Sequence, residues 1–444
     1  MEGDRVAFLH PHIKTKLPGP KSKRVLALDE KYVSPSYTRS YPLVAKSGRG
    51  SFIEDMDGNV FLDFTSGIAV TASGHCHPRV VKAIQEQAAK LIHMSGTDFY
   101  YPQQAELAKR LVNLFPGGKG SGKAFLTNSG AESVEAALKL ARWVTKRPQI
   151  ISFLGAFHGR TMGALSVTGS KITQKERFFP LVPGVTHVPY PDPYHTPKGM
   201  TPDDYTNFCL DWISERIFKT IVPPSEVAAI IVEPIQGEGG YIVPQNSFFK
   251  GLRKICDAHG ILLIVDEVQS GIGRTGKMFA IEHTGVTPDI ICIAKGIASG
   301  LPLGAMIARG SIMHWTTGAH ANTFGGNPLA CVAATATLDL LDEGMMKNAA
   351  KQGEYLMKNL QGMMRRHSEI GDVRGRGLMV GAEIVSDRKR KTRAPKRRND
   401  IVDKAFRKGL LLLGCGPNTI RFAPPLSVTR AEVDMALKIF EACL

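Results

Sequence analysis

The 444-residue sequence lacks a long uninterrupted apolar segment. No stretch approaches the roughly 18 uncharged apolar residues that a membrane-spanning helix needs. The N-terminal region also lacks the continuous apolar core of a signal peptide. We therefore expect a cytoplasmic protein without a membrane anchor. A hydrophobic content of 43% and a charged content of 22% are ordinary for a globular protein.

Cysteines are few and scattered along the chain. There are seven of them, an odd number, and no two form a CxxC pair. This pattern predicts reduced thiols rather than a disulfide framework or a zinc site, and we expect no metal ion.

Acidic residues are scarce relative to basic ones, so the formal net charge is +16. Such an excess can indicate nucleic-acid binding. However, one run, residues 388–398 (RKRKTRAPKRR), supplies eight basic residues, and without it the excess falls to +8. Because a single basic loop is more often a solvated insertion than a binding site, we expect no nucleic-acid partner and keep that role as an alternative of a different class. The remaining excess equally suits anionic substrates and a phosphorylated cofactor.

The chain is long enough for more than one domain, and its middle alternates between strand and helix patterns. The expected strands are apolar throughout: residues 124–126, 150–153, 227–232, 261–265 and 290–294. Helical patterns fall at residues 131–144 and 247–258. This alternation predicts a parallel sheet covered by helices on both faces. The first forty residues show no sustained periodicity, and we expect an arm that lies on the body of the protein or on a partner.

Two charged residues follow neighbouring apolar runs in this region. Asp266 follows residues 261–265 and Lys295 follows residues 290–294, so both are expected at the carboxyl ends of strands, where doubly wound sheets bind ligands. A lysine there can form a Schiff base with the aldehyde of pyridoxal 5′-phosphate (PLP). A carboxylate can pair with the pyridine nitrogen and make the ring an electron sink. Taken alone, a structural ion pair at the sheet edge is the better explanation.

Two other segments add features that are weak in isolation. Ser129 and Glu132 have the spacing of a capping box, and the exposed helix start offers N–H groups and a positive dipole end to a phosphate. Gly130 would let the anion approach the backbone. In the loop GAFHGR, Phe157 could stack on a planar ring and Arg160 could hold a carboxylate. An ordinary capped helix and a glycine-rich loop with a core phenylalanine explain them equally well.

Taken together, the segments resemble a known family. NSGAE, AFHGR, VEPIQGEGG, DEVQSGIGRTG, AKGIASGLPLGA and TFGGNPLA occur in this order, and the chain resembles the class III, or ω-, aminotransferases of the fold-type I PLP enzymes from about Tyr41 to its C-terminus. The resemblance implies an α/β fold with a large domain, built on a mostly parallel doubly wound sheet, and a smaller α+β domain. We place the arm and part of the small domain in residues 1–75, the large domain in 76–330 and the C-terminal small domain in 331–444.

The resemblance also assigns residues to the cofactor. Lys295 matches the Schiff-base lysine and Asp266 the partner of the pyridine nitrogen, and both are the expected catalytic residues. The other matches are Gln269 near the ring hydroxyl, Phe157 on the ring face, Gly130 and Ala131 at the phosphate, and Thr323, which reaches the phosphate from the neighbouring subunit. The family therefore implies an obligate homodimer or a dimer of dimers, with an active site shared across a two-fold axis.

Four residues bear on the substrate. Arg421 matches the arginine that holds the α-carboxylate of the oxo acid, and Glu238 matches the glutamate that pairs with it when the donor has no α-carboxylate. Ile68 and Arg160 match the 4-aminobutyrate (GABA) aminotransferases, in which the arginine takes the far carboxylate and the apolar residue replaces a tyrosine of ornithine-type relatives. The resemblance thus implies amino transfer from an ω-amino donor, GABA above others, to 2-oxoglutarate, giving an aldehyde and glutamate.

Two other activities remain open. Some relatives racemise or epimerise α-amino acids, which requires only that the proton return to the opposite face of the same carbanion. Ornithine or acetylornithine transamination is the other. The segment HMSGTDFYYPQQ, at residues 93–104, departs from the pattern expected of bacterial GABA enzymes and borders the substrate pocket.

Overall fold

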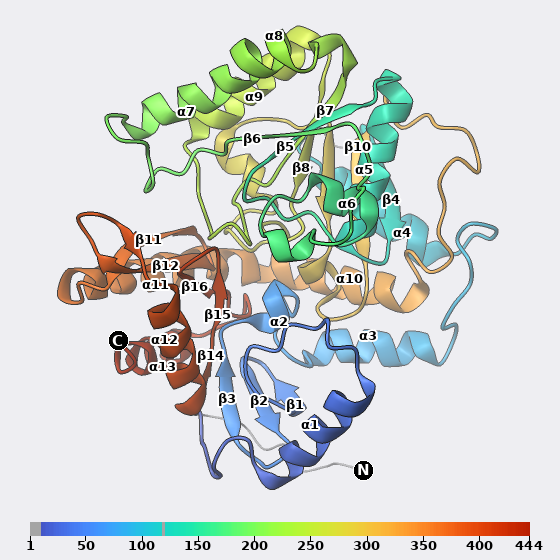
Figure 1. Cartoon of the computed structure of the whole chain (residues 1–444). Coiled ribbons are helices and arrows are strands. Elements are labelled where there is room, and N and C mark those ends of the chain that lie inside the picture. The colour runs from blue at the N-terminus through green and yellow to red at the C-terminus, as the bar shows by residue number, and fades with distance from the viewer. Residues whose placement is uncertain (1–9, 118–119) are drawn as a thin grey trace.

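The computed structural model describes residues 10–117 and 120–444 (Figure 1). Its centre is a seven-stranded sheet. The strands are β4 (Gly122–Thr127), β5 (Gln149–Phe153), β6 (Val185–Val188), β7 (Val227–Val232), β8 (Leu262–Asp266), β9 (Ile290–Ile293) and β10 (Gly304–Arg309). Their order is β4-β10-β9-β8-β7-β5-β6, and only β10 runs antiparallel to its neighbours. The predicted mostly parallel sheet is confirmed.

Helices cover both faces of this sheet, as the continuous apolar strands require. The helices are α4 (Pro102–Leu114), α5 (Gly130–Thr145), α6 (Met162–Val167), α7 (Pro202–Asp211), α8 (Phe218–Thr220) and α9 (Asn246–His259). Alternate side chains of β7 point to opposite faces: Ile231 packs in the cluster that holds Val134 of α5, whereas Ile230 packs in the cluster that holds Phe248 of α9. Every residue of β7 is buried.

A segment from the N-terminal part of the chain and one from the C-terminal part pair in a second, four-stranded sheet, which lies below the large one in Figure 1. Its strands are β1 (Ala45–Arg49), β2 (Phe52–Asp55), β3 (Val60–Asp63) and β14 (Leu410–Leu411). β14 pairs with β3 in parallel, so a strand from the last forty residues completes a sheet that begins near residue 45. Along the chain, β3 is followed by two helices, α2 (Ser66–Ala69) and α3 (Pro78–Ala88).

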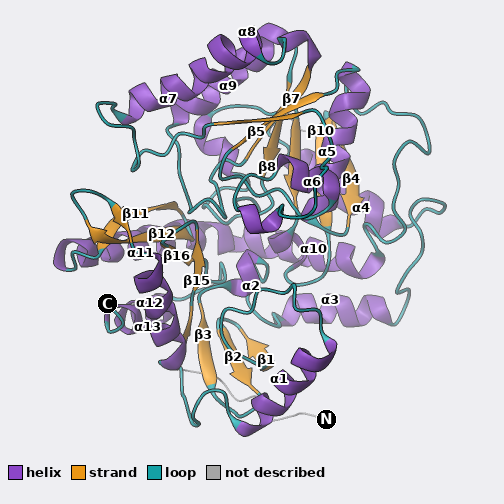
Figure 2. Cartoon of the chain, in the orientation of Figure 1, coloured by secondary structure: helices purple, strands orange, loops and turns teal. Residues whose placement is uncertain are grey.

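The rest of the C-terminal part forms a third sheet with helices beside it (Figure 2). Its strands are β11 (Ile370–Arg376), β12 (Met379–Asp387), β13 (Thr392–Arg393), β15 (Leu413–Cys415) and β16 (Thr419–Phe422). The helices are α10 (Pro328–Leu340), α11 (Met346–Arg366), α12 (Pro395–Arg407) and α13 (Arg430–Glu441). Short 3₁₀ or π segments lie at Ile172–Gln174, Trp212–Ile217, Pro224–Glu226, Ala280–Thr284, Lys295–Ala298 and Leu341–Met345. The α/β fold class with a smaller α+β part is as expected, while the exact domain boundaries stay a prediction.

The N-terminal arm contains a helix, α1 (Pro20–Tyr32), that the sequence patterns did not indicate. Asp57 caps this helix from a distant turn: its carboxylate accepts hydrogen bonds from the N–H groups of Lys21 (2.8 Å) and Ser22 (2.9 Å). Pro20 occupies the first helical position, where no N–H is needed. Because the capping residue lies 36 positions along the chain, no local signal could reveal it.

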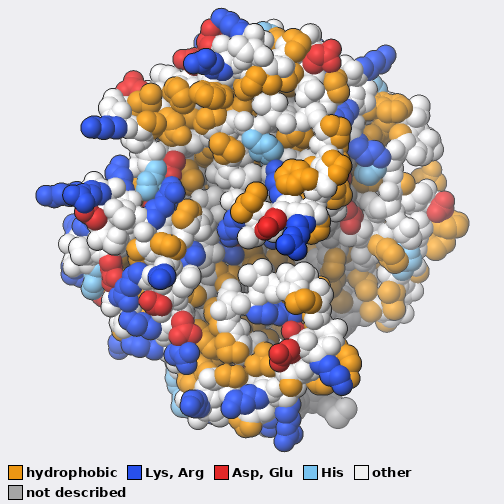
Figure 3. Space-filling view, viewed as in Figure 1, with side chains coloured by type: hydrophobic (Ala, Val, Ile, Leu, Met, Phe, Trp, Pro, Cys, Tyr) orange, Lys and Arg blue, Asp and Glu red, His pale blue; other side chains and the backbone are white. Residues whose placement is uncertain are grey.

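The basic run at residues 388–398 is largely exposed, as expected of a solvated segment, but it is not an irregular loop. It contains β13 and the first turn of α12, and several of its side chains bind backbone or acidic groups. Arg388 donates to the carbonyls of His367 (2.6 Å) and Ile370 (2.7 Å), and Arg397 pairs with Glu369 at 2.6 Å. On the face shown in Figure 3, Lys and Arg side chains are scattered over this part of the molecule with acidic side chains among them.

Among the described residues, no helix is both long and apolar enough to cross a lipid bilayer.

We predict that Asp57→Ala frees the start of α1, because two N–H groups of the first turn lose their acceptor. Backbone amides of residues 21–24 should then exchange with deuterium several-fold faster, as measured by hydrogen-exchange mass spectrometry. Asp57→Asn is the control, since its amide oxygen can still accept. Equal exchange rates in wild type and Asp57→Ala would contradict the assignment of Asp57 as the cap.

Candidate active site

Functional side chains gather at one edge of the central sheet. β4, β5, β7, β8 and β9 all end there, because these strands share one direction. Their carboxyl ends surround a cavity of about 420 Å³. Seven of the expected residues line it: Gly130, Ala131, Phe157, Arg160, Asp266, Gln269 and Lys295. An adjoining cavity of about 870 Å³ adds Ile68, Glu238 and Arg421 and shares Phe157, Arg160, Gln269 and Lys295.

Asp266 is the last residue of β8, and its carboxylate is held in place by two bonds. Oδ1 accepts from the N–H of Val268 at 2.9 Å, and Oδ2 contacts Nδ1 of His158 at 2.7 Å. Both the Asp266 and the His158 side chains are buried. His158 was missed in the sequence, although it follows Phe157 in the loop AFHGR. Its Nε2 is buried without a partner among the described residues, so the ring supports the carboxylate through Nδ1 alone.

Lys295 lies two residues beyond β9 and begins a 3₁₀ turn. Its φ of +45° is in the left-handed region, which non-glycine residues seldom adopt and which is often found at functional sites. Burial lowers the pKa of the Lys295 amine, while the carboxylates of Asp266 and Glu233 act in the opposite direction. A lowered pKa enlarges the neutral fraction of the amine, and the neutral form is the nucleophile and the base.

The start of α5 is built to receive an anion. Ser129 caps the helix by accepting from the N–H of Glu132 at 3.2 Å. The reciprocal bond of the predicted capping box is different: Glu132 accepts from the N–H of Asn128, at 2.9 Å, and not from that of Ser129. The N–H groups of Gly130 and Ala131 belong to the first turn and have no intrahelical acceptor. A Cβ atom on Gly130 would lie 2.7 Å from Val268, so the close packing there requires glycine.

A second buried carboxyl, that of Glu233, fixes two loops at once. Oε1 accepts from the N–H of Phe157 and Oε2 from the N–H of Gly237, both at 2.9 Å. Glu233 is part of the segment VEPIQGEGG, but the motif alone did not indicate a role for it. Burial raises the pKa of Glu233 to about 7, with His158 opposing and Asp266 adding to the rise. One carboxyl therefore sets the position of the aromatic ring and of the loop that carries Glu238.

Glu238 lies between two cations in the adjoining cavity. Its Oε1 is 3.1 Å from Nη1 of Arg421, which is on β16, and its Oε2 is 2.9 Å from Nζ of Lys171. Burial alone would raise the pKa of Glu238, but Arg421 and Lys171 lower it overall, so the carboxyl is ionised. Lys171 was not singled out in the sequence, because nothing local connects it with a residue 67 positions away.

Arg160 is exposed at the mouth of both cavities. Its guanidinium carbon lies 5.6 Å from the centre of the Phe157 ring, a cation–π distance. No hydrogen bond or ion pair joins Arg160 to any other described residue. Ile68 lines the wider cavity and is 44% exposed. Tyr41 and other residues between positions 36 and 43 line the same cavity, so part of the N-terminal arm closes the site.

Gln269 and Thr323 differ in their placement. Gln269 lines both cavities, and its side-chain oxygen accepts from the hydroxyl of the buried Tyr241 at 3.0 Å. Thr323 is exposed and lines neither cavity. The structure describes one chain, so the assignment of Thr323 to the neighbouring subunit's phosphate stays a prediction.

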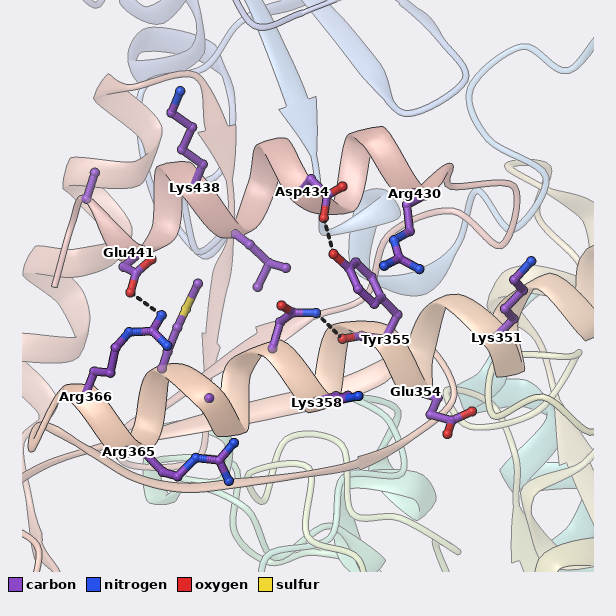
Figure 4. Close-up of a pocket in the computed structure, with 15 residues that line it drawn as sticks. Lys351, Glu354, Tyr355, Lys358, Arg365, Arg366, Arg430, Asp434, Lys438 and Glu441 are labelled. Atoms are coloured by element: carbon purple, nitrogen blue, oxygen red, sulfur yellow. Dashed lines mark hydrogen bonds and ion pairs between the residues drawn. The ribbon is translucent and has the colours of Figure 1, made fainter.

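A larger surface groove, of about 970 Å³, runs between α11 and α13, remote from the sheet edge (Figure 4). Its polar side chains largely bind one another: the Tyr355 hydroxyl donates to Asp434, and Arg366 pairs with Glu441. Arg430 lies over the ring of Tyr355. None of the residues expected to bind cofactor or substrate lines this groove, so we place the active site at the sheet edge.

The residues at the sheet edge fit PLP by their chemistry. The free N–H groups of α5 suit a phosphate, the buried carboxylate of Asp266 suits a protonated pyridine nitrogen, and the amine of Lys295 suits an aldehyde. Phe157 offers an aromatic face between them. A cavity of about 420 Å³ is within the usual size range of small-molecule sites.

Comparisons with known proteins agree with this chemistry. The family model described as "Aminotransferase class-III" matches residues 32–444. The chain is 42% identical to the alanine/serine racemase of Pyrococcus horikoshii, covering 98% of this chain and 93% of the relative. It is 40% identical to the 4-aminobutyrate aminotransferase GabT of Escherichia coli, covering 91% and 93%. A solved amine transaminase from an uncultivated Pseudomonas species, in a PLP-bound form, superposes with a TM-score of 0.86 at 34% identity, covering 93% of this chain and 98% of the other.

We predict that Glu233 makes the stability of the cofactor-free protein depend on pH. Because its pKa is raised to about 7 in the folded state, the stabilising protonated form is fully present at low pH and is lost as pH rises through 7. Wild type should therefore lose stability relative to Glu233→Gln, which cannot ionise, between about pH 5 and pH 8. Thermal unfolding of both proteins across this range is the measurement. Parallel Tm curves would contradict a raised pKa.

Proposed function

The chain belongs to the class III aminotransferase family, and from this premise we propose that it transfers the amino group of an ω-amino acid, with GABA as the best candidate, to 2-oxoglutarate. It is a PLP-dependent enzyme that works on an amino donor and an oxo acid. The proposal concerns the identity of the two substrates, and the products would be an aldehyde and glutamate.

One observation carries the choice of donor: three arginines line the wider cavity, and of these Arg39 and Arg421 are paired with carboxylates whereas, within the described parts of the chain, Arg160 is free. Arg421 is paired with Glu238, whereas Arg160 has no acidic partner among the described residues. GABA has one carboxylate, remote from its amine, and none on the carbon that reacts. Such a donor matches a free guanidinium at the mouth and a neutralised one beside the reacting carbon. Ile68 supports this choice, because it leaves the wall beside it apolar.

The residues of this chain then take distinct parts in the reaction. When bound, PLP supplies the aldehyde that takes the amine and the electron-withdrawing ring. Asp266, which is bonded to His158, would pair with the protonated pyridine nitrogen, and Phe157 would contact the face of the ring. With the cofactor bound, the amine of Lys295 would act as the general base that takes the proton from the donor's reacting carbon, and would supply that proton again to complete the transfer. Its lowered pKa suits a base that works near neutral pH.

The acceptor half of the reaction needs a different state of the pocket. The α-carboxylate of 2-oxoglutarate requires Arg421, so Glu238 has to release it, while Arg160 can bind the second carboxylate. A pocket that changes in this way accepts both an ω-amine and an α-oxo acid.

Amino-acid racemisation is the second candidate, and the similarity to an alanine/serine racemase favours it. The same base and cofactor would serve, provided that the proton returns to the opposite face of the carbon. Ornithine or acetylornithine as donor is the third possibility among amine transfers.

We predict that Lys295→Ala abolishes covalent attachment of PLP, because the variant has no amine at that position. After borohydride reduction and denaturation, mass spectrometry should detect the cofactor on the wild type and not on the variant, and turnover should fall to background. The exposed Lys277, replaced by alanine, is the control. Cofactor still attached to Lys295→Ala would overturn the assignment.

We predict that GABA with 2-oxoglutarate yields glutamate, and that Arg160→Met raises the KM for GABA at least about tenfold, the effect of losing roughly 1.4 kcal/mol of carboxylate binding. Coupled glutamate detection measures both. L-alanine and L-serine are incubated separately, and chiral chromatography follows the D-isomers. D-isomers formed without any oxo acid, together with no glutamate from GABA, would favour the racemase and refute the proposal. Ornithine and acetylornithine complete the donor series.

A further inference from the structure

The carboxylate of Glu238 is shared between two cations that lie in different surroundings. Arg421 is buried on β16, whereas the side chain of Lys171 is 44% exposed. The two bonds use different oxygens of the carboxylate, at 3.1 Å and 2.9 Å, so one can break while the other remains.

Another cavity, of about 590 Å³, adjoins the substrate cavity at this carboxylate. Glu238 and Lys171 line both cavities, so their ion pair lies at the boundary between the two. Arg393, from the basic run, also lines the second cavity, and among the described residues Glu238 is the only acidic one that does. This space is therefore large enough, and positive enough, to receive a displaced carboxylate.

The backbone around Glu238 is fixed, so a displacement can involve only the side chain. The carbonyl of Glu238 accepts from the N–H of Gly416 at 2.7 Å, and the carbonyl of Gly240 accepts from the guanidinium of Arg374 at 2.7 Å. Arg374 is in turn paired with Glu383 at 2.7 Å. Rotation about the Glu238 side-chain bonds is the movement that this arrangement leaves free.

We propose that Lys171 is a positioning residue for the acceptor half of the reaction: it keeps hold of Glu238 when an α-carboxylate takes Arg421, and draws the carboxylate into the 590 Å³ cavity. This inference rests on the proposed exchange of substrates at Arg421. A carboxylate that left Arg421 without another partner would be half-buried and unpaired, which is costly. Lys171 lowers that cost, because its long flexible side chain can follow the carboxylate and Arg393 adds a second positive charge.

The experiment measures binding rather than turnover. Glutarate has the two carboxylates of 2-oxoglutarate but no oxo group, and its Kd for the PLP-loaded enzyme is obtained by isothermal titration calorimetry. We expect Lys171→Met to weaken glutarate about tenfold, in the range of measured couplings between contacting charges. Lys171→Arg should restore the affinity to within about twofold, since it keeps the charge. Lys198→Met removes an exposed lysine that lines neither cavity and should change nothing.

A double-mutant cycle with Glu238→Gln isolates the mechanism. In that background no carboxylate needs a new partner, so the Lys171→Met effect on glutarate should shrink to less than about twofold. An undiminished effect would mean that Lys171 binds the ligand directly, and tighter binding by Lys171→Met alone would mean that Lys171 holds the pocket closed. Either result overturns the inference. Because glutarate binding needs no amino donor, failure of the GABA assay leaves this test intact and the two failures are distinguishable.

Discussion

The shared direction of β4, β5, β7, β8 and β9 is the constraint on which the site depends. Parallel strands bring their carboxyl ends to one edge, so residues that are far apart in the chain meet without any long loop. Asp266 ends β8 and pairs in register with Cys292 of β9, and Lys295 follows three residues later. Strand pairing therefore brings the backbone positions of Asp266 and Lys295 to the same edge of the sheet.

Concentrating charge at this edge creates an electrostatic problem, because Asp266 and Glu233 are both buried carboxyls. Two adjacent carboxylates in a poorly solvated site cannot both ionise cheaply. The pKa of Glu233 is raised to about 7, chiefly by burial and further by the neighbouring Asp266, so Glu233 can carry a proton near neutrality. The two carboxyls also have different structural roles. Glu233 binds backbone N–H groups of two loops, and Asp266 points into the cavity.

The features that could be predicted from the sequence are those that depend on strand pattern and chain order. The strand at Val227–Val232 matched its apolar run, and the proximity of Asp266 and Lys295 followed from placing both after parallel strands. Contacts between remote segments could not be read in the same way. The cap on α1 comes from Asp57, and a second partner of Glu238, beside Arg421, is Lys171; in both cases the pairing is set by tertiary packing, which leaves no local signal.

The ion pair between Glu238 and Arg421 bears most directly on the choice between the candidate activities. An enzyme whose every substrate carries an α-carboxylate, as in racemisation, has to break this pair each time and gains nothing from forming it. In an enzyme that alternates between an ω-amine and an α-oxo acid, the ion pair stabilises the half of the cycle in which the ω-amine reacts. During that half, Glu238 neutralises a buried guanidinium, that of Arg421, which would otherwise be unpaired. In the half of the cycle in which the α-oxo acid reacts, the ion pair must open. Lys171 and the cavity beside Glu238 reduce the free-energy cost of that opening. The arrangement of Lys171, Glu238 and Arg421 therefore favours alternation between two kinds of substrate over repeated use of one.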